Sequence, residues 1–368
     1  MTSITYVGMD VHTTNYTLCC YGIENDTIFA TVQVAPHYDN IVKYLKKVKE
    51  NSGYESFLCG YEAGCLGYSL YHQLKSAGIN CVILAPTSMP RISKNEIKTD
   101  KRDAAKIAKC LAYNTYSPVY VPDDEDNAVK EYIRLRDSQK DALKRIKQQI
   151  NAFCTRYGKA FEGKSKWTRA HICWLEKLEF DDGILQETFK EYLMLYSQAV
   201  SKLKVFDERI AKLADKERYA DNVKKLRCLI GVETHTAMAI ISETGDFKRF
   251  KSARQYAAYL GLVPGETSSG NMRCRTGITK AGNTHIRILL TESAQCYSRG
   301  SHGIKTKALA EKQSGNSSEV ISYADKANER LRRKFRKILT TSKRNIAVTA
   351  VARELSCFIW GLMTDNIA

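Results

Sequence analysis

Two carboxylates stand three residues apart in a basic stretch of the chain. Asp100 and Asp103 lie in the segment IKTDKRDAAKIA, residues 97–108, among lysines and arginines. If the segment is helical, both side chains share one face, and like charges held that close repel unless a positive group lies between them. The pair therefore indicates either one arm of a metal site, with a divalent ion or the flanking lysines as the positive group, or a solvated helix face of mixed charge.

The elements expected around this pair favour the metal site. Strand-like runs occur at 4–11, 15–23, 27–35, 56–63 and 80–86, and helical periodicity occurs at 39–50, 67–78 and 100–113, with Asp39 as the expected N-cap of the first helix. Three strands followed by alternating helices and strands are the layout of the α/β ribonuclease-H-like fold. That fold performs two-metal phosphodiester chemistry with carboxylates on its first strand, fourth strand and last helix.

Four acidic residues fall at those positions. Asp10 lies in the first strand, Glu62 ends the fourth, and Asp100 and Asp103 begin the last helix. An aspartate in an apolar strand is costly without a partner, and four converging carboxylates are compatible only with cations between them. An all-oxygen site that meets phosphate favours Mg²⁺. We predict that these four residues bind Mg²⁺ and that nearby cations contact phosphate: Lys98, Lys101 and Arg102.

A second candidate site lies in a glycine-rich loop, GETSSGNMRCRTGITKAGN, residues 265–283. Ser268 and Ser269 precede Gly270, which permits close approach of a ligand. A serine needs activation to become a nucleophile, and cations can stabilise charge on a transferring phosphate. The cations close behind the serines are Arg273, Arg275 and Lys280. No His–Asp pair completes a triad, since His285 is the only close imidazole, so a polar phosphate-binding loop remains the alternative.

The composition indicates a polyanionic partner. The 368 residues suffice for two or three domains, and 57 Lys and Arg against 40 Asp and Glu give a net charge of +17. Such a surplus favours nucleic acid, although a basic but otherwise ordinary enzyme remains the alternative. The twelve cysteines form no C-x-x-C pair, and no secretory or membrane-spanning segment is evident. We therefore expect a cytoplasmic protein with reduced thiols and no membrane partner.

Two long helices are expected in the middle of the chain. The first runs without breakers from 129 to 153. The second carries apolar residues at alternating steps of three and four, from Phe189 to Leu213, which is a heptad seam. The seam predicts a coiled-coil arm, and this arm is either an internal antiparallel hairpin or the interface of a homodimer or tetramer.

The last part of the chain predicts a mainly α-helical domain with a basic tail. The segment ERLRRKFRKILTTSKR, residues 329–344, forms rows of cations if it is helical. These rows either contact the backbone of RNA or DNA or form a solvated helix face. The residues in the rows are Arg332, Arg333, Arg336 and Lys337.

These motifs together resemble a known family. The segments YVGMDV, GYEAG and KTDKRDA near the N-terminus, and GLVPGETSSGNMRCRTGITKAGNTHIRILLTESA later, are similar to the DEDD-type insertion-sequence transposases. These recombinases join a resolvase-like (RuvC-like) domain to a serine-bearing transposase domain. The resemblance covers nearly the whole chain and is loosest in the helical arm. It implies three regions: a RuvC-like domain at 1–122, the arm at 123–222 and the serine transposase domain with the basic tail at 223–368.

The resemblance also implies a mechanism and partners. The family's acidic quartet corresponds to Asp10, Glu62, Asp100 and Asp103, and its Ser-Gly step corresponds to Ser269. The expected activity is cutting and rejoining target and donor DNA through a phosphoserine link. A structured non-coding (bridge) RNA is expected to select the sites, and the protein is expected to associate with the nucleoid. Two alternatives are a metal-dependent Holliday-junction resolvase, which leaves the serine loop unused, and a non-catalytic nucleic-acid scaffold.

Overall fold

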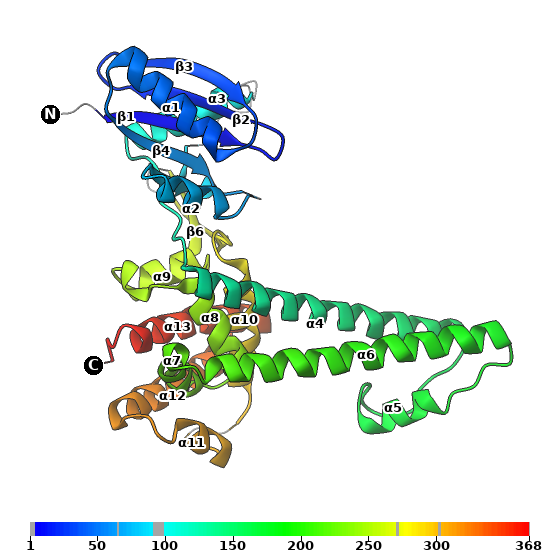
Figure 1. Ribbon diagram of the computed structural model, residues 1–368. Helices are drawn as coiled ribbons and strands as arrows, with labels where there is room; N and C mark the ends of the chain where they lie inside the picture. The colour runs from blue at the N-terminus through cyan, green and yellow to red at the C-terminus, as the bar shows by residue number, and fades with distance from the viewer. Residues whose placement is uncertain (1–3, 65, 91–98, 270–271, 301–302, 368) are drawn as a thin grey trace. The chain divides into compact units, whose positions relative to one another are not determined.

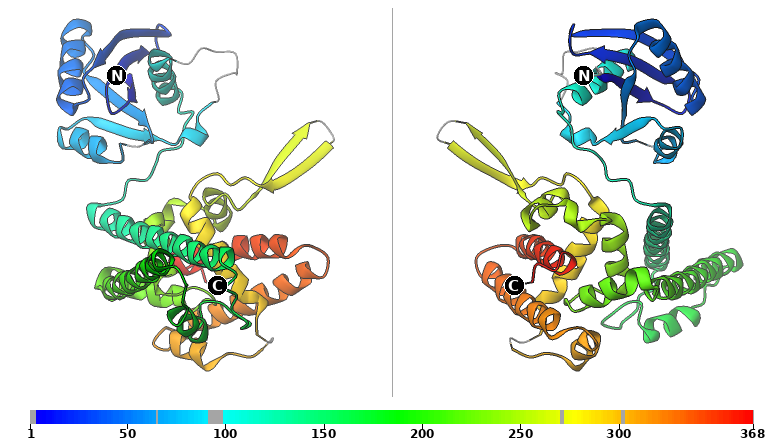
Figure 2. Two further views of the ribbon diagram at one scale, coloured as in Figure 1. Left: turned by 90° about the vertical axis from the view of Figure 1, so that its right-hand side faces the viewer. Right: turned by 60° about the vertical axis from the view of Figure 1, so that its left-hand side comes forward.

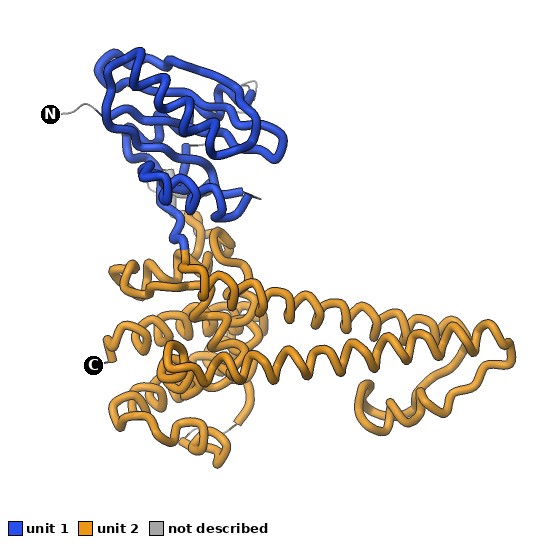
Figure 3. The backbone as a smooth tube through the Cα atoms, in the orientation of Figure 1, with its two compact units in different colours: residues 1–121 blue, residues 122–368 orange. Residues whose placement is uncertain are grey.

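The computed structural model describes residues 4–64, 66–90, 99–269, 272–300 and 303–367. The chain divides into two compact units, Met1–Val121 and Pro122–Ala368 (Figure 3). The second unit includes both the region predicted as an arm and the region predicted as the C-terminal domain.

Unit 1 is built on one mixed sheet of five strands (Figure 1). The strand order is β3-β2-β1-β4-β5, in which β1, β2 and β3 pair antiparallel and β1, β4 and β5 pair parallel. The arrangement agrees with the expected ribonuclease-H-like α/β domain. Its elements are β1 (Ile4–Val11), β2 (Tyr16–Gly22), β3 (Thr27–Val34), α1 (Tyr38–Ser52), β4 (Ser56–Glu62), α2 (Ser69–Ser76), β5 (Asn80–Leu84), η1 (Pro86–Ser88) and α3 (Asp100–Ala112).

The two faces of this sheet carry different helices. Met9 of β1 and Tyr61 of β4 belong to the core that α1 and α2 complete with Ile41 and Leu70. On the other face, α3 packs on the strands through fully buried Ala104 and other small or apolar residues. Because side chains alternate along a strand, the residues that flank Met9 and Tyr61 in sequence face α3.

The start of α1 differs from the sequence expectation. The N-cap is His37, whose Nδ1 accepts a hydrogen bond from the Asp39 amide at 3.4 Å, and Asp39 lies in the first turn. Aspartate is also favourable in the first turn, where it interacts with the helix dipole. The prediction of Asp39 as the cap was therefore wrong by two residues.

Gly8 permits a close approach between α3 and β1. A Cβ at this position would lie 1.9 Å from the carbonyl oxygen of Ala104 and 2.9 Å from the Cβ of Ala108. The oxygen belongs to the helix backbone, so no side-chain rotation would relieve that overlap. The glycine thus sets the distance between the strand that carries Asp10 and the helix that carries Asp100.

Gly8→Ala is expected to destabilise unit 1 by at least about 2 kcal/mol, because α3 would have to move away from the sheet. The matched control is Gly22→Ala on β2, where the nearest atom to an added Cβ is 3.7 Å away. Urea unfolding followed by circular dichroism measures both variants. Equal stabilities for the two would contradict the close packing of α3 on β1.

Unit 2 is mostly helical. Two long helices extend from a compact helical body (Figure 1). Its elements are α4 (Asp124–Arg156), α5 (Arg169–Glu176), α6 (Gly183–Ala214), α7 (Glu217–Arg227), α8 (Thr234–Thr244), η2 (Phe247–Arg249), α9 (Ala253–Tyr259), β6 (Pro264–Ser269), β7 (Met272–Ile278), α10 (Thr284–Gln295), η3 (Cys296–Ser298), α11 (Lys307–Gln313), α12 (Ser318–Leu339) and α13 (Arg344–Met363).

The two long helices, α4 and α6, pack side by side as an internal antiparallel hairpin (Figure 1). Phe153 near the end of α4 stacks on Phe189 near the start of α6, with ring centroids 5.8 Å apart. Ile133 near the start of α4 shares a core with Ile210 near the end of α6. The seam predicted from sequence therefore packs within the chain, at least in the buried part of its length.

The body of unit 2 has its core around α13. Val351, Ala352, Leu355 and Ile359 of this helix are fully buried. By length and composition α13 would suffice to cross a membrane, but half of its apolar window is buried inside the protein. It packs against α9, α10 and α12, so its apolar character is explained by the core.

The serine segment is a β-hairpin and not the loop expected from sequence. Strands β6 and β7 pair antiparallel and project from the helical body of unit 2 (Figure 2). Four glycines and few apolar residues in 265–283 conceal the period of two that identifies most strands.

Candidate active site

The sheet of unit 1 brings Asp10 and Glu62 to neighbouring strand ends. Met9 of β1 pairs with Tyr61 of β4 in parallel register, so the next residues, Asp10 and Glu62, stand beside each other. Met9 and Tyr61 face the core under α1 and α2, and Asp10 and Glu62 therefore face the side covered by α3. Glu62 is exposed, whereas Asp10 is partly buried.

Helix α3 supplies the other two carboxylates. Asp100 and Asp103 lie in its first turn, and Thr99 caps the helix by accepting a hydrogen bond from the Arg102 amide. Carboxylates are stabilised at this end of a helix by the dipole and the unpaired amides. The predicted spacing of three residues is thus realised on a helix whose N-terminus starts beside the strand ends.

A histidine joins this group that the sequence analysis did not single out. His12 Nε2 lies 3.2 Å from Asp10 Oδ2, and ligand atoms of Asp10, His12 and Asp100 all lie within 4.8 Å of one another. His12 lies one residue beyond the end of β1, so strand periodicity alone does not predict its side chain beside Asp10. Carboxylate oxygens with one imidazole nitrogen are a donor set that fits a divalent cation.

The electrostatics of Asp10 fit the same interpretation. Burial raises the pKa of Asp10, and the charges of Asp100 and Asp103 raise it further, while His12 opposes them. A bound cation would favour the ionised form of Asp10 and would reduce the repulsion between its carboxylate and the two others. Asp100 and Asp103 thus interact electrostatically with Asp10, whereas strand register places Glu62 beside Asp10.

The cations predicted to contact phosphate lie at the start of α3. Lys101 and Arg102 are exposed in its first turn. Lys98 lies outside the described residues. The side chains of Lys101 and Arg102 are therefore at the surface in the same turn of α3 as Asp100 and Asp103.

In unit 2, the hairpin places Ser269 at the end of β6. Its backbone register pairs Ser269 with Met272 and Ser268 with Arg273, while Arg275 pairs with Glu266. Both predicted arginines are therefore close to the serines along the hairpin.

The third predicted cation, Lys280, lies away from the serines. It follows the far end of β7, where its amide donates to the Gly261 carbonyl at 3.1 Å. From Met272 to Ile278 the strand rises by roughly 20 Å. Within one chain Lys280 is therefore not beside Ser269, contrary to the sequence expectation.

A buried charge network holds the segment that follows the hairpin. His285 of α10 lies between two carboxylates: its Nδ1 is 3.0 Å from Glu243 Oε1 and its Nε2 is 2.7 Å from Asp137 Oδ2. Glu243 also accepts hydrogen bonds from Arg134 and from Asn283, the residue that caps α10. The network joins α4, α8 and α10. The partners of His285 were not predictable from the sequence, because Asp137 is 148 residues away.

This network makes His285 a cation over most of the pH range. Burial alone lowers the pKa of His285, but hydrogen bonds to Asp137 and Glu243 and their charges outweigh it and raise the pKa to about 9. Burial likewise opposes ionisation of Glu243, and His285, Arg134 and Asn283 outweigh it and lower its pKa to about 2. His285 is thus unsuited to accept a proton from a serine near neutral pH, and its role is structural.

The stability of unit 2 is expected to depend on pH through His285. A raised pKa contributes stability that is complete below about pH 6.5 and is lost as the pH rises through 9, on the order of 3 kcal/mol. The depressed pKa of Glu243 contributes stability that is present above about pH 4.5 and is lost as the pH falls towards 2. The network is therefore most stabilising between about pH 4.5 and 6.5.

Tryptophan fluorescence checks this expectation, since all three tryptophans, Trp167, Trp174 and Trp360, lie in unit 2. The free energy of unfolding should fall between pH 6.5 and 9 in the wild type and stay level in His285→Asn. A wild-type stability that does not change over this interval would contradict the assignment of a charged His285.

The four basic residues predicted to contact nucleic acid differ in their exposure and in their partners on α12. Arg332 is buried and donates to the Ile304 carbonyl at 3.2 Å, and Arg336 donates to the Gly300 carbonyl. Arg333 is 72% exposed and pairs with Glu329, and Lys337 is exposed. Arg333 and Lys337 therefore suit the predicted contact with nucleic acid, whereas Arg332 is used in packing.

Two protein families match separate parts of the chain. A family described as "Transposase", of the DEDD type found in IS110 elements, matches residues 7–158. A family described as "Transposase IS116/IS110/IS902 family" matches residues 223–309. The transposase for insertion sequence element IS1533 of Leptospira borgpetersenii is 34% identical over 342 residues, which cover 92% of this chain and 98% of the relative. The chain belongs to the IS110/IS116 family of transposases.

Further relatives carry similar names. A putative transposase, y4qE, of Sinorhizobium fredii is 36% identical over 306 residues, or 83% of this chain and 75% of the relative. The transposase for insertion sequence element IS1111A of Coxiella burnetii is 23% identical over 266 residues, or 70% and 72%. The transposase is accordingly an enzyme that cleaves and rejoins DNA. The resolvase alternative is not favoured, because the matched regions include the serine hairpin as well as the acidic domain.

Proposed function

We propose that this transposase cuts and rejoins DNA through a covalent link between Ser269 and the DNA, with Mg²⁺ at the acidic group of unit 1. The observation that carries the proposal is the pairing of two sites in one chain. Asp10, His12 and Asp100 gather on the ribonuclease-H-like sheet, and Ser269 ends a strand that faces an arginine-bearing strand. A metal-only nuclease would have no use for the second site.

The first step of the proposed reaction forms one phosphorus–oxygen bond and breaks another. The Ser269 hydroxyl attacks a DNA phosphate, a phosphorus–oxygen bond forms to the serine, and the bond to one DNA oxygen breaks, which releases a DNA hydroxyl. The serine proton passes to a carboxylate of the acidic group, and the departing DNA oxygen takes up one proton from water to become the hydroxyl. Attack by the hydroxyl of another strand on the phosphoserine reverses the step and rejoins DNA. Mg²⁺, when bound, would supply charge stabilisation on the transferring phosphate, and Arg273 and Arg275 would add to it.

The metal assignment rests on the ligand types. Asp10, Glu62, Asp100 and Asp103 offer carboxylate oxygens, which are the ligands that Mg²⁺ prefers. His12 adds a nitrogen next to Asp10, and it would act either as a further ligand or as a hydrogen-bond donor that orients Asp10.

A structured non-coding RNA is the proposed guide that selects target and donor DNA. The support is the resemblance of the motifs and the net charge of +17, which favours a nucleic-acid partner. Sequencing RNA that co-purifies with the transposase tests this part. Enrichment of one structured RNA is the expected result, and random cellular fragments would reject the guide.

We also propose that the helical hairpin of α4 and α6 assembles the transposase into a homo-oligomer. Apolar side chains remain exposed on α6, including Met194 at 46% and Val205 at 61%. These two residues are eleven apart and therefore lie on one face of the helix. Light scattering on the purified protein tests the proposal, since a monomer at micromolar concentration would contradict it.

The covalent step has a direct test. The transposase is incubated with labelled donor-end DNA, denatured and separated from free DNA. Label that stays with the protein after denaturation is the expected result, and active protein without such label would refute the phosphoserine link.

A further inference from the structure

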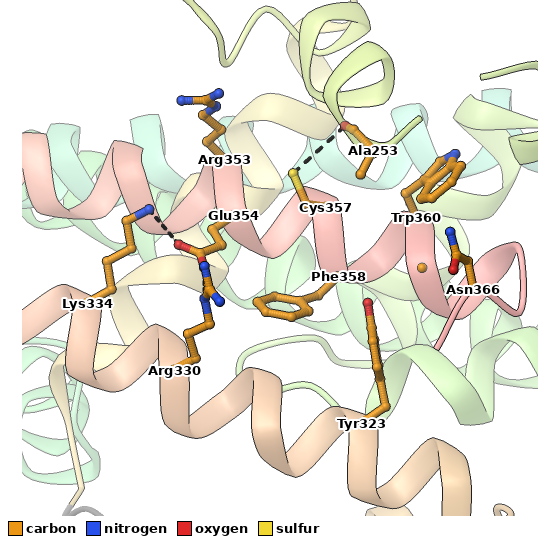
Figure 4. A pocket seen from close by; sticks show the side chains of 11 residues that line it. Ala253, Tyr323, Arg330, Lys334, Arg353, Glu354, Cys357, Phe358, Trp360 and Asn366 are labelled. Carbon is orange, nitrogen blue, oxygen red and sulfur yellow. Dashed lines mark hydrogen bonds and ion pairs between the residues drawn. The ribbon is translucent and has the colours of Figure 1, made fainter. Parts of the chain in front are cut away.

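A groove between α12 and α13 in unit 2 has no role in the proposed strand exchange. It consists of two adjoining cavities of about 500 and 660 Å³, a size usual for small-molecule sites. Both cavities are lined by Arg330, Lys334 and Glu354 and therefore adjoin each other, and we call the two together the α12–α13 groove. Figure 4 shows its first cavity, with side chains of both helices directed into the space between them.

One end of the groove is aromatic. Tyr323 of α12 and Phe358 and Trp360 of α13 line the first cavity, and the Tyr323 and Phe358 rings meet edge to face with centroids 5.7 Å apart. Figure 4 places Tyr323 and Phe358 between the two helices. Flat aromatic walls of this kind bind the π-face of another ring.

The other end is cationic. Arg330, Arg333, Lys334 and Lys337 line the second cavity, and their spacing of three, four and seven residues places them on one face of α12. Arg330 and Arg333 are 71% and 72% exposed. The sequence analysis had placed Arg332 and Arg336 in such a row, but both donate to carbonyl groups of the chain.

A single carboxylate lies where the two ends meet. Glu354 accepts hydrogen bonds from Arg330 and from Lys334, the latter at 2.5 Å. Burial opposes its ionisation, but hydrogen bonds and charges from Lys334 and Arg330 outweigh burial and lower its pKa. An ionised carboxylate beside an aromatic wall is an acceptor for the N–H groups on the edge of a nucleobase.

We propose that the α12–α13 groove binds an unpaired nucleotide of a single-stranded nucleic acid. The base stacks in the aromatic cavity, and the adjoining phosphates follow the cationic face of α12. A duplex cannot fill both ends, because its bases are stacked and paired. An acidic peptide would use the cations but would leave the aromatic cavity empty. The proposal rests on the function given above insofar as that function supplies a nucleic-acid partner.

The test measures binding alone, in the Ser269→Ala background and without Mg²⁺, so its outcome is independent of cleavage chemistry. Fluorescent twelve-nucleotide oligouridine is titrated by anisotropy, with oligodeoxyuridine and an RNA duplex as further arms. The two single-stranded arms distinguish an RNA source of the nucleotide from a DNA source. We expect at least one of them to bind more tightly than the duplex.

Two variants separate the ends of the groove. Phe358→Leu keeps apolar volume and removes the ring, and affinity should fall about 5- to 150-fold, the range for one lost base stack. The double variant Arg333→Gln with Lys337→Gln should reduce the salt slope of log affinity by about 1.4, for two phosphate contacts on a single strand. The matched control, Lys190→Gln with Lys204→Gln on exposed positions of α6, should leave that slope unchanged.

A photo-crosslink provides a readout that does not depend on folding of the Phe358→Leu variant. Oligonucleotide with one 5-iodouridine should crosslink the otherwise wild-type groove at Tyr323, Phe358 or Trp360, as mapped by mass spectrometry. Crosslinks only at other residues would overturn the proposal. So would duplex that competes as well as single strands, or polyglutamate that displaces the oligonucleotide at equal charge concentration. A missing phosphoserine link would reject the proposed mechanism and leave this groove unaffected.

Discussion

Ser269→Ala is expected to abolish strand exchange by the transposase and the covalent protein–DNA link. The substitution removes the only hydroxyl at the position that matches the family's Ser-Gly step, while the strand pairing of β6 with β7 is carried by the backbone. Loss of a nucleophile leaves only binding and charge stabilisation, so the rate should fall by at least about a thousandfold. Binding of DNA should remain, because no charge is removed.

The neighbouring serine is the natural control. Ser268→Ala also removes a serine hydroxyl, from the preceding residue, which pairs with Arg273 in the hairpin. The covalent link should persist in this variant. Both variants are incubated with donor-end DNA labelled at one end, and denaturing electrophoresis then shows whether the label stays with the protein. A link that vanishes in Ser268→Ala and persists in Ser269→Ala would move the nucleophile by one residue, because the two hydroxyls differ only in position.

The imidazole that lies closest to Ser269 in the sequence, His285, is not suited to accept the serine proton. His285 is engaged by Asp137 and Glu243, and those contacts hold it in the charged form. In the proposed reaction the acceptor is a carboxylate of the acidic group of unit 1. Whether the acceptor comes from the same chain or from another subunit is read by mixing Ser269→Ala protein with an acidic-site variant: recovery of activity in the mixture indicates sites shared between subunits.

The acidic domain was predictable because its signals are local. Each strand of unit 1 shows apolar or alternating residues over five to eight positions, and the strand and helix bounds match within a few residues. Asp10, Glu62, Asp100 and Asp103 followed from that order of elements. His12 could not be predicted from the strand pattern, because it lies one residue beyond the end of β1 and the expected ligands of the fold are carboxylates.

The serine domain was less predictable because its contacts are distant in sequence. The hairpin of β6 and β7 carries few apolar residues, since it projects from the body and the side chains that the structure describes on it are exposed or only partly buried (Figure 2). The partners of His285 come from α4 and α8, and nothing in a single sequence pairs Asp137 with His285. The basic tail shows the same limit: helical spacing identifies the cations, but packing decides that Arg332 is buried and Arg330 exposed.

Asp100→Asn is expected to abolish DNA cleavage in Mg²⁺ while DNA binding remains. The change keeps the shape of the side chain and its place in the first turn of α3, but it removes one negative charge, that of a proposed metal ligand, from the group with Asp10 and His12. A metal ion contributes several kcal/mol to the stabilisation of charge on a transferring phosphate. Since each 1.36 kcal/mol is a factor of ten in rate, the expected loss is at least about a thousandfold.

The matched control is Glu55→Gln, which neutralises an exposed carboxylate of unit 1 outside the acidic group and should leave cleavage unchanged. Metal binding gives a second readout that does not need DNA. Mg²⁺ should raise the melting temperature of the wild type and of Glu55→Gln, because a ligand that binds only the folded state stabilises it, and should raise that of Asp100→Asn much less. Cleavage near the wild-type rate together with an unaltered response to Mg²⁺ would show that Asp100 is not a metal ligand.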